Sequence, residues 1–473
     1  MFTAKNIKLI VAIAIPIFIL FLPATAIPID NLSIIEQRVI ALFVMATLFW
    51  ILEPIPVFAT SVLIIALELF MMSDKSFLLF QNTAGLENFG KAISYKAIMA
   101  TFASPIILLF LGGFFLAMAA TKYRLDVNLA RVLLKPFGTN PRWVLLGLMV
   151  ITAVFSMFMS NTATTAMMLA LLTPILASLD DGDAGKAAFV LGIPFAANIG
   201  GIGTPIGTPP NAVALKYLTG EFAIGFGEWM SFAVPFVIVM LIFAWRLLLF
   251  LFPPQSPKLE LTIKSKFLKN WKAVTVYATF VITILLWLLD GFHGMNSYVV
   301  AMIPVAVFSA SGIITKEDLK LISWDVLWLV SGGIALGMAM EETGLAKNLI
   351  ENIPFDTFPA IAIVLSTTLI ALLMATFMSH TATSNLILPI VSALGVNLAS
   401  LELFGGGKML ILSVTFACSL AMALAISTPP NAMAQATGLV RSDQLMKSGL
   451  TISIVGLLGV YLLMFILKQI AFF

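Results

Sequence analysis

The sequence predicts an all-α membrane protein that crosses the bilayer many times and consists of two related halves. Of its 473 residues, 60% are hydrophobic and only 10% are charged. A soluble domain carries about 25% charged residues, so most of this surface is expected to face lipid. Several polar motifs also recur at one spacing, which indicates an internal duplication.

Apolar runs of the length that a helix needs to cross the bilayer, about 20 residues, occur throughout the chain. Nine of them are uninterrupted: 7–27, 34–52, 55–72, 104–121, 229–252, 273–290, 296–313, 324–342 and 449–470. Glycine and proline interrupt two more, 187–219 and 409–437, which we expect to be broken helices. Two others, 143–179 and 358–399, have polar centres. We expect re-entrant hairpins there, because irregular backbone at membrane depth must be buried in protein.

The charges in the loops predict the orientation. The loops at 122–142 and 253–272 carry five basic residues each, whereas 341–357 holds four acidic residues and one lysine. Basic residues concentrate in cytoplasmic loops. With a cytoplasmic N-terminus, the first two loops lie inside and the third outside. This predicts about eleven transmembrane helices, two hairpins and an external C-terminus in the inner (plasma) membrane. The basic residues sit in short loops, so they do not indicate a nucleic-acid partner.

The internal repeat carries most of the functional argument. FMSNTAT from Phe158 returns as FMSHTAT from Phe377, and TPPNA from Thr208 returns unchanged from Thr428. The glycine pair that begins at residue 112 returns at residue 332. The offsets are 377 − 158 = 219, 428 − 208 = 220 and 332 − 112 = 220. For the glycine pairs alone, close helix packing is the preferred interpretation.

The spacing divides the chain into an extra N-terminal helix within 1–33, a first repeat at 34–252, a cytoplasmic loop at 253–272 and a second repeat at 273–473. Each repeat has about five crossings, and an odd number makes the two copies face opposite ways. Inverted repeats are typical of secondary transporters, whose binding site lies at the repeat interface near the midplane.

The paired motifs suit a small anion. Asn161 and His380 can donate to a carboxylate, and the neighbouring Ser and Thr hydroxyls can donate or accept. A hairpin tip also exposes a helix N-terminus, which favours negative charge. Carbonyls freed by the glycine- and proline-rich breaks are possible Na⁺ ligands. The alternative is that Ser and Thr only join neighbouring helices, but the duplication favours a site. Glu68, an ionisable residue within a span, stays unassigned.

These paired Ser-Asn-Thr tips and Pro-Pro-Asn breaks resemble the divalent anion:sodium symporter family, the INDY-type carboxylate transporters, over essentially the whole chain. The resemblance implies an elevator-type transporter, usually a homodimer, in which hairpins and broken helices move against a fixed scaffold. It implies citric-acid-cycle dicarboxylates, citrate or sulfate as substrates.

The resemblance also implies the roles of individual residues. Seven of them are expected to contact the substrate: Asn161, Thr162, Thr208, Pro209, Thr381, Thr428 and Pro429. His380 is added to this set because of its chemistry. A first sodium site would use Ser156, Ser160, Asn161 and Gly207. A second would use Ser379 and an asparagine, but this chain has His380 there, and imidazole is a poor Na⁺ ligand.

Several mechanisms stay open. Exchange of one dicarboxylate for another, among succinate, malate, fumarate and 2-oxoglutarate, is preferred because a protonatable histidine could replace sodium in compensating charge. Sodium-coupled symport and proton coupling through His380 are the alternatives, as are sulfate or citrate as the substrate. An anion channel is a further class. We find no nucleophile–base pair or metal-ligand cluster in the sequence, so we expect neither an enzyme nor a cofactor other than Na⁺.

Overall fold

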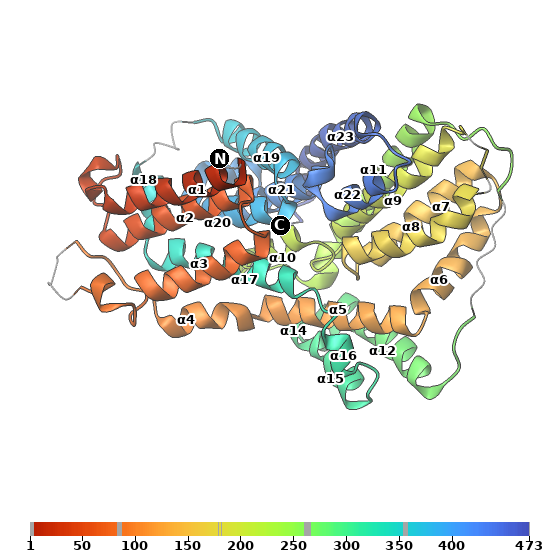
Figure 1. The fold of residues 1–473 in the computed structure, drawn as a ribbon, viewed down its shortest axis with the longest axis horizontal. Helices are drawn as coiled ribbons and strands as arrows, with labels where there is room; N and C mark the ends of the chain where they lie inside the picture. The colour runs from red at the N-terminus through yellow and green to blue at the C-terminus, as the bar shows by residue number, and fades with distance from the viewer. Residues whose placement is uncertain are drawn as a thin grey trace.

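The computed structural model describes residues 4–82, 88–177, 179–180, 182–259, 266–352 and 358–472. Within these ranges the chain is helical, and its β-structure is a single bridge between Ser73 and Ile93. This confirms the predicted all-α class. Helices α1–α3 lie at one end of the long axis and α6–α8 at the other (Figure 1).

The helices form two series that follow α1 (Ala4–Phe21). The first comprises α2 (Ile34–Leu52), α3 (Val57–Met71), α4 (Tyr95–Ala100), α5 (Pro105–Lys122), α6 (Leu125–Leu134), α7 (Pro141–Ser156), α8 (Asn161–Ala177), α9 (Gly185–Gly201), α10 (Pro209–Leu215) and α11 (Phe226–Leu251). The second comprises α12 (Trp271–Leu288), α13 (Asp290–His293), α14 (Ser297–Val300), α15 (Met302–Ala310), α16 (Lys316–Leu319), α17 (Trp324–Glu342), α18 (Leu345–Asn352), α19 (Ala360–Phe377), α20 (His380–Asn397), α21 (Gly406–Ser419), α22 (Pro429–Ala436) and α23 (Ser442–Gln469).

Local sequence explains where many of these helices begin. Proline occupies the first helical position of α5, α7, α10 and α22. It is tolerated there because that position needs no intrahelical N–H donor. Ser33 and Glu36 form a capping box at the start of α2, which satisfies backbone donors at the helix N-terminus.

Two segments predicted as plain loops contain short helices. α6 lies within 122–142, and α18 lies within 341–357. Leu345 of α18 is buried, whereas Lys347 and Glu351 are exposed and form an ion pair at 3.6 Å. The charges that predicted a loop are therefore on the outer face of an amphipathic helix. Residues 260–265 of the predicted cytoplasmic loop lie outside the described ranges.

The predicted span at 296–313 is divided into α14 and α15. Pro304 provides the physical reason, because its ring clashes with the carbonyl four residues earlier, at Val300. The last helix begins at Ser442 rather than near residue 449, and α1 ends at Phe21, before Pro23, rather than near residue 27.

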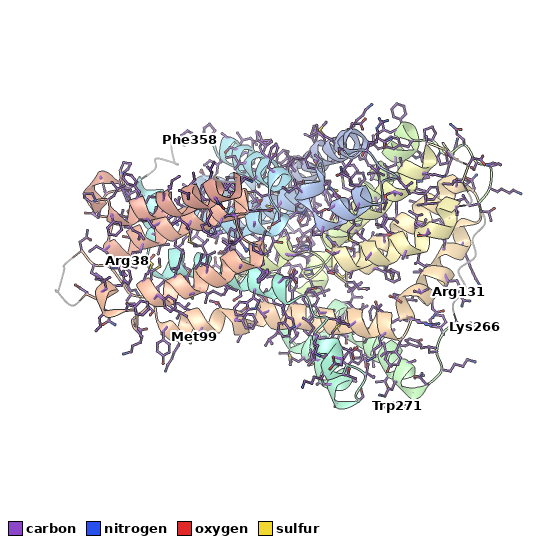
Figure 2. All side chains as sticks on the ribbon, viewed as in Figure 1. Arg38, Met99, Arg131, Lys266, Trp271 and Phe358 are labelled. Carbon is purple, nitrogen blue, oxygen red and sulfur yellow. The ribbon has the colours of Figure 1, made fainter. Side chains whose placement is uncertain are left out.

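Apolar residues on the outside of the structure are consistent with a lipid-facing surface. Met99, Trp271 and Phe358, labelled in Figure 2, are each more than half exposed. In the described part of the chain, six helices have at least 18 residues and the apolar composition of a membrane span. They are Ile34–Leu52, Tyr95–Lys122, Phe226–Leu251, Trp271–Leu288, Ala360–Phe377 and Ser442–Gln469. The total of eleven crossings stays a prediction.

The two series pack into each other rather than side by side. α17 packs against α3, and α5 packs against α14 and α15. A Cβ at Gly332 would lie 2.4 Å from Ser61 Cβ, and one at Gly112 would lie 2.4 Å from the Ala301 carbonyl oxygen. Both glycines therefore allow close helix crossings, as predicted.

The hairpins and broken helices of one series pack against those of the other. α10 packs against α20, and α22 packs against α8 and α9. α11 and α23, which follow the broken helices, also contact each other. The centre of the protein is thus built from both halves.

Candidate functional site

A cavity of about 260 Å³ lies where the two hairpin tips and the two helix breaks meet. Among the described residues that line it, Asp325 is charged and none is lysine or arginine. Eleven of the twelve residues predicted for the substrate and sodium sites line this cavity: Ser160, Asn161, Thr162, Gly207, Thr208, Pro209, Ser379, His380, Thr381, Thr428 and Pro429. The twelfth, Ser156, hydrogen-bonds to Asn161 from behind it.

Helix N-termini surround the cavity. α8 and α20 begin at the hairpin tips, and α10 and α22 begin directly after the breaks. Ser160 Oγ accepts from the Ala163 N–H at 3.2 Å, and Ser379 Oγ accepts from the Ala382 N–H at 3.2 Å. These hydroxyls therefore cap α8 and α20. The positive ends of the helices make the cavity attractive to an anion without a cationic side chain.

Asn211 stabilises the first break. Its Nδ2 donates to the carbonyl oxygens of Gly201 at 3.1 Å, Ile202 at 3.3 Å and Thr204 at 2.8 Å. These carbonyls belong to the end of α9 and the turn after it, where helical partners are lost. The asparagine of the Thr-Pro-Pro-Asn motif thus holds the broken backbone in place.

Asn431 does the same in the second half. Its Nδ2 donates to the carbonyl oxygens of Met422 at 3.0 Å and Leu424 at 3.1 Å. The identical motifs therefore have the same structural role in both halves. Some of the carbonyl oxygens that the sequence suggested as Na⁺ ligands therefore accept hydrogen bonds from these asparagines.

Oxygen atoms converge on the Asn161 side chain. One end of its amide lies 2.5 Å from Ser156 Oγ, 3.0 Å from the Gly207 carbonyl oxygen and 3.3 Å from that of Ala197. With nitrogen at that end, the amide donates to all three atoms. With oxygen at that end, four oxygens face one another, which is the type of ligand set that a hard cation accepts.

Two glycines make this convergence possible. A Cβ at Gly207 would lie 2.5 Å from the Gly201 carbonyl oxygen and 2.9 Å from that of Ser156. A Cβ at Gly201 would lie 2.6 Å from Asn161 Oδ1. A side chain at Gly201 would push against the Asn161 amide, and one at Gly207 would push against two neighbouring carbonyl oxygens. With the amide oxygen at that end, Ser156, Asn161 and Gly207 therefore fit the predicted first sodium site, whereas Ser160 caps α8 instead.

The corresponding place in the second half is built differently. His380 Nε2 donates to the Ala421 carbonyl oxygen at 2.6 Å, and the imidazole is buried. At the repeat offsets, Ala375 replaces Ser156, Ala421 replaces Gly201 and Ser427 replaces Gly207. The second half thus lacks the two side-chain oxygens of the set, those of Ser156 and Asn161, and has side chains where the first half has Gly201 and Gly207. The residues present therefore do not fit a second sodium site.

Asn198 of α9 is a central residue that the sequence reasoning missed. Its Nδ2 donates to Thr428 Oγ1 at 3.2 Å and Asn431 Oδ1 at 3.3 Å, and its Oδ1 lies 3.5 Å from Asn161 Nδ2. It lines the cavity and joins the two breaks. The residue 220 positions later is Cys418, so Asn198 belongs to no repeated motif. The available signal was a lone amide inside an apolar broken helix.

A second cavity, of about 390 Å³, shares residues with the first and leads away from it. Phe114, Met159 and Ser160 line both, and Lys122 and Asp318 line the far end. Lys122 Nζ lies 2.5 Å from Asp318 Oδ2. Burial alone would raise the pKa of Asp318, but hydrogen bonds from Lys122 and Thr315 hold this pKa below its ordinary value.

The helical fold, the packing of the two series into each other and the cavity between the helix breaks are features of membrane transporters. The chain belongs to the citrate transporter family, whose model matches residues 47–405. This confirms the predicted relationship to anion:cation symporters, and the family consists of transporters rather than enzymes.

Three relatives show the range of this similarity. The sodium-dependent dicarboxylate transporter SdcS of Staphylococcus saprophyticus is 29% identical over 93% of this chain and 87% of its own length. An uncharacterised transporter of Schizosaccharomyces pombe is 32% identical over 89% of this chain and 48% of its own length. The inorganic phosphate transporter PHO87 of Saccharomyces cerevisiae is 31% identical over 85% of this chain and 43% of its own length. The chain thus spans about half the length of the two yeast proteins.

Solved structures show the same fold. The YdaH transporter of Alcanivorax borkumensis aligns with a TM-score of 0.52 at 13% sequence identity, over 92% of this chain and 98% of that one. At this identity the likeness concerns the fold alone.

Proposed function

We propose that the protein transports small dicarboxylates, such as succinate, malate, fumarate and 2-oxoglutarate, and exchanges one for another across the plasma membrane. The observation that supports this proposal most strongly is the 260 Å³ cavity. Helix N-termini surround it, and no lysine or arginine is among the described residues that line it. Pockets for drug-sized ligands begin at about 300 Å³, so this cavity suits a small anion.

The arrangement of donors favours an anion with two charged ends. Asn161 and Thr162 lie at one hairpin tip, and the hydroxyls of Ser379 and Thr381 lie at the other. The Nε2–H of His380, predicted as an anion donor, is used by the Ala421 carbonyl oxygen instead. Two separate donor sets suit two carboxylates better than one compact tetrahedral anion. Sulfate, citrate and phosphate remain competing substrates in the experiment, phosphate because of the name of the PHO87 relative.

The difference between the halves supports exchange. The oxygen set around Asn161 could hold one Na⁺, while His380 occupies the equivalent place in the second half. A transporter with one sodium site has less charge compensation for a dianion than one with two. Symport with a single Na⁺ is the alternative that the SdcS relative supports.

An elevator movement and a homodimer complete the proposal. The hairpins and broken helices pack together as one unit. Beside it, α17 packs against α3 and α5, and α5 packs against α15. We expect that unit to carry the anion past these scaffold helices. The orientation with a cytoplasmic N-terminus and an external C-terminus belongs to the same proposal.

Counterflow in proteoliposomes tests this function. Vesicles loaded with succinate should accumulate labelled succinate from outside without Na⁺, and unlabelled malate should compete. Asn161→Ala should abolish uptake, whereas Asn296→Ala, an exposed cap of α14, should not. If vesicles without internal anion accumulate labelled succinate only when Na⁺ is present, the mechanism is symport rather than exchange. Competition by phosphate or sulfate but by no carboxylate would overturn the substrate class.

A further inference from the structure

One hydrogen bond of His380 fixes the tautomer of its imidazole ring. His380 is the first residue of α20, is 6% exposed and lines the 260 Å³ cavity. Its Nε2 lies 2.6 Å from the Ala421 carbonyl oxygen. Because a carbonyl oxygen can only accept a hydrogen bond, Nε2 carries the hydrogen.

The other ring nitrogen, Nδ1, is therefore an acceptor. In the described part of the chain, His380 is joined to Ala421 and forms no ion pair with a carboxylate. A buried imidazole without such a partner is expected to be neutral, because an unpaired buried charge is costly. A neutral ring with its hydrogen on Nε2 has a lone pair on Nδ1 and nothing there to donate.

Nδ1 can be reached from the anion cavity. It has no hydrogen-bond partner among the described residues, and it is not one of the unpaired polar atoms that are sealed from solvent. The small exposed part of His380 therefore includes Nδ1, and the 260 Å³ cavity is the space that this residue lines. A molecule bound in the cavity meets an acceptor that still needs a donor.

An acceptor at this place discriminates between dicarboxylates. Both ends of fully ionised succinate only accept hydrogen bonds, so neither can satisfy Nδ1. A buried acceptor that stays unpaired costs free energy, whereas a hydroxyl beside the carboxylate can donate to it. Ser379 and Thr381, the sequence neighbours of His380, have hydroxyls that can donate to that carboxylate. The second hairpin tip thus offers both kinds of group that a 2-hydroxycarboxylate needs.

The first hairpin tip offers a different set of groups. Asn161 stands at the position equivalent to His380, and its amide lies against Ser156 Oγ and backbone carbonyl oxygens. Among the described side chains that line the cavity, Asp325 is the other one that only accepts when ionised, but it is exposed and can bind water. The two ends of the cavity therefore differ chemically, as do the two ends of a dicarboxylate with one hydroxyl group.

We propose that His380 Nδ1 accepts a hydrogen bond from a substrate hydroxyl, and that the protein selects 2-hydroxydicarboxylates, such as malate, over succinate. This inference rests on the proposed transport function and narrows its substrate class. The two carboxylates bind at the two hairpin tips, and the hydroxyl lies beside the second. Because three groups of the anion then have fixed places, one enantiomer of malate should bind better than the other.

Competition at about pH 8 tests the selection, because carboxylic acids are ionised there and the hydroxyl is the remaining O–H donor. Unlabelled anions compete with labelled succinate in counterflow. One enantiomer of malate should inhibit at a concentration about tenfold lower than unlabelled succinate. 2-Methylsuccinate, which has a methyl group in place of the hydroxyl, should show no such gain. Equal inhibition by malate and succinate would overturn the proposal.

Two variants test whether His380 makes the selection. His380→Phe, which removes both ring nitrogens, should reduce the preference for malate to less than about twofold. Asp325→Asn is the matched control, because it changes the other acceptor of the cavity, and it should keep the preference. A preference that survives in folded His380→Phe, or that disappears in Asp325→Asn, would contradict the assignment to His380.

Nuclear magnetic resonance of the purified protein needs no variant of His380 and no transport. The chain has two histidines, so ¹⁵N-labelled histidine gives a simple spectrum, and His293→Gln identifies the signals of His380. Without ligand, Nδ1 of His380 should have the chemical shift of an unprotonated ring nitrogen. Malate should move this signal by hydrogen bonding, whereas succinate should leave it in place.

This measurement separates the inference from the proposed function. A shift of Nδ1 on malate binding, without any dicarboxylate exchange in vesicles, would refute the transport function and keep the hydroxyl site. Exchange of dicarboxylates together with a protonated Nδ1, or with an Nδ1 signal that malate does not move, would refute the hydroxyl site and keep the function.

Discussion

His380 and Ala421 are joined by a hydrogen bond of 2.6 Å from the imidazole Nε2 to the backbone carbonyl. In the first half, Asn161 and Gly201 occupy the equivalent positions, and the absence of a side chain at Gly201 leaves room for the Asn161 amide among three oxygens. The replacement of Asn161 by His380 therefore accompanies the loss of this oxygen-lined position in the second half. This difference determines what we expect from mutations in each half.

His380→Asn should reduce exchange and should not create sodium dependence. The asparagine restores one oxygen, but Ala375 still lacks the hydroxyl of Ser156. Ala421 and Ser427 still have side chains where Gly201 and Gly207 leave room in the first half. Adding Ala375→Ser, Ala421→Gly and Ser427→Gly should produce sodium-stimulated uptake. Uptake at a range of Na⁺ concentrations measures this. If His380→Asn alone shows wild-type exchange that ignores Na⁺, His380 has no role in coupling.

Gly207→Ala should lower transport by at least tenfold. The new Cβ would lie 2.5 Å from the Gly201 carbonyl oxygen, in backbone that cannot yield cheaply. Gly113→Ala is the matched control, because it lines the same cavity and its Cβ would meet nothing closer than 3.6 Å. Initial rates of counterflow for the two variants check this, and equal rates would contradict the crowding argument.

Asn198→Ala should weaken anion binding and lower the melting temperature. The substitution leaves the buried Asn431 Oδ1 without its donor, at a cost of about 1–3 kcal/mol, whereas Thr428 Oγ1 still accepts from the Asn431 backbone N–H. Thermal unfolding in detergent measures stability, and succinate-induced stabilisation measures binding. Asn397→Ala, an exposed helix residue, should change neither quantity. A variant with unchanged stability and binding would remove Asn198 from the site.

Asp318→Asn should weaken the contact at the end of the 390 Å³ cavity. The pKa of Asp318 lies below its ordinary value, so its ion pair with Lys122 contributes stability above that ordinary value. The contribution is lost as the pH falls through the lowered pKa. Melting temperatures should therefore converge for wild type and variant in acid and differ at neutral pH. A constant difference at all pH values would contradict the ionic origin.

Sequence predicted the features that repeat and missed those that do not. The Thr-Pro-Pro-Asn motifs and hairpin tips occur twice, and their residues line one cavity. Asn198 occurs only in the first half, since Cys418 stands at the equivalent position of the second. Its role is visible only in the packing of α22 against α9. Proline positions predicted breaks well, but Pro304 lies within an apolar run that composition alone treats as continuous. The short helix α18 was missed because its charged face is what the sequence displays most clearly.

The hydrogen bonds from Asn198 to Thr428 and Asn431 join α9, which ends at the first break, directly to the start of α22, which follows the second break. In the proposed transport cycle we therefore expect α9 and α22 to move together, and the anion to enter and leave on another side of the cavity. A disulfide that joins α9 to α22 should leave the transport rate unchanged.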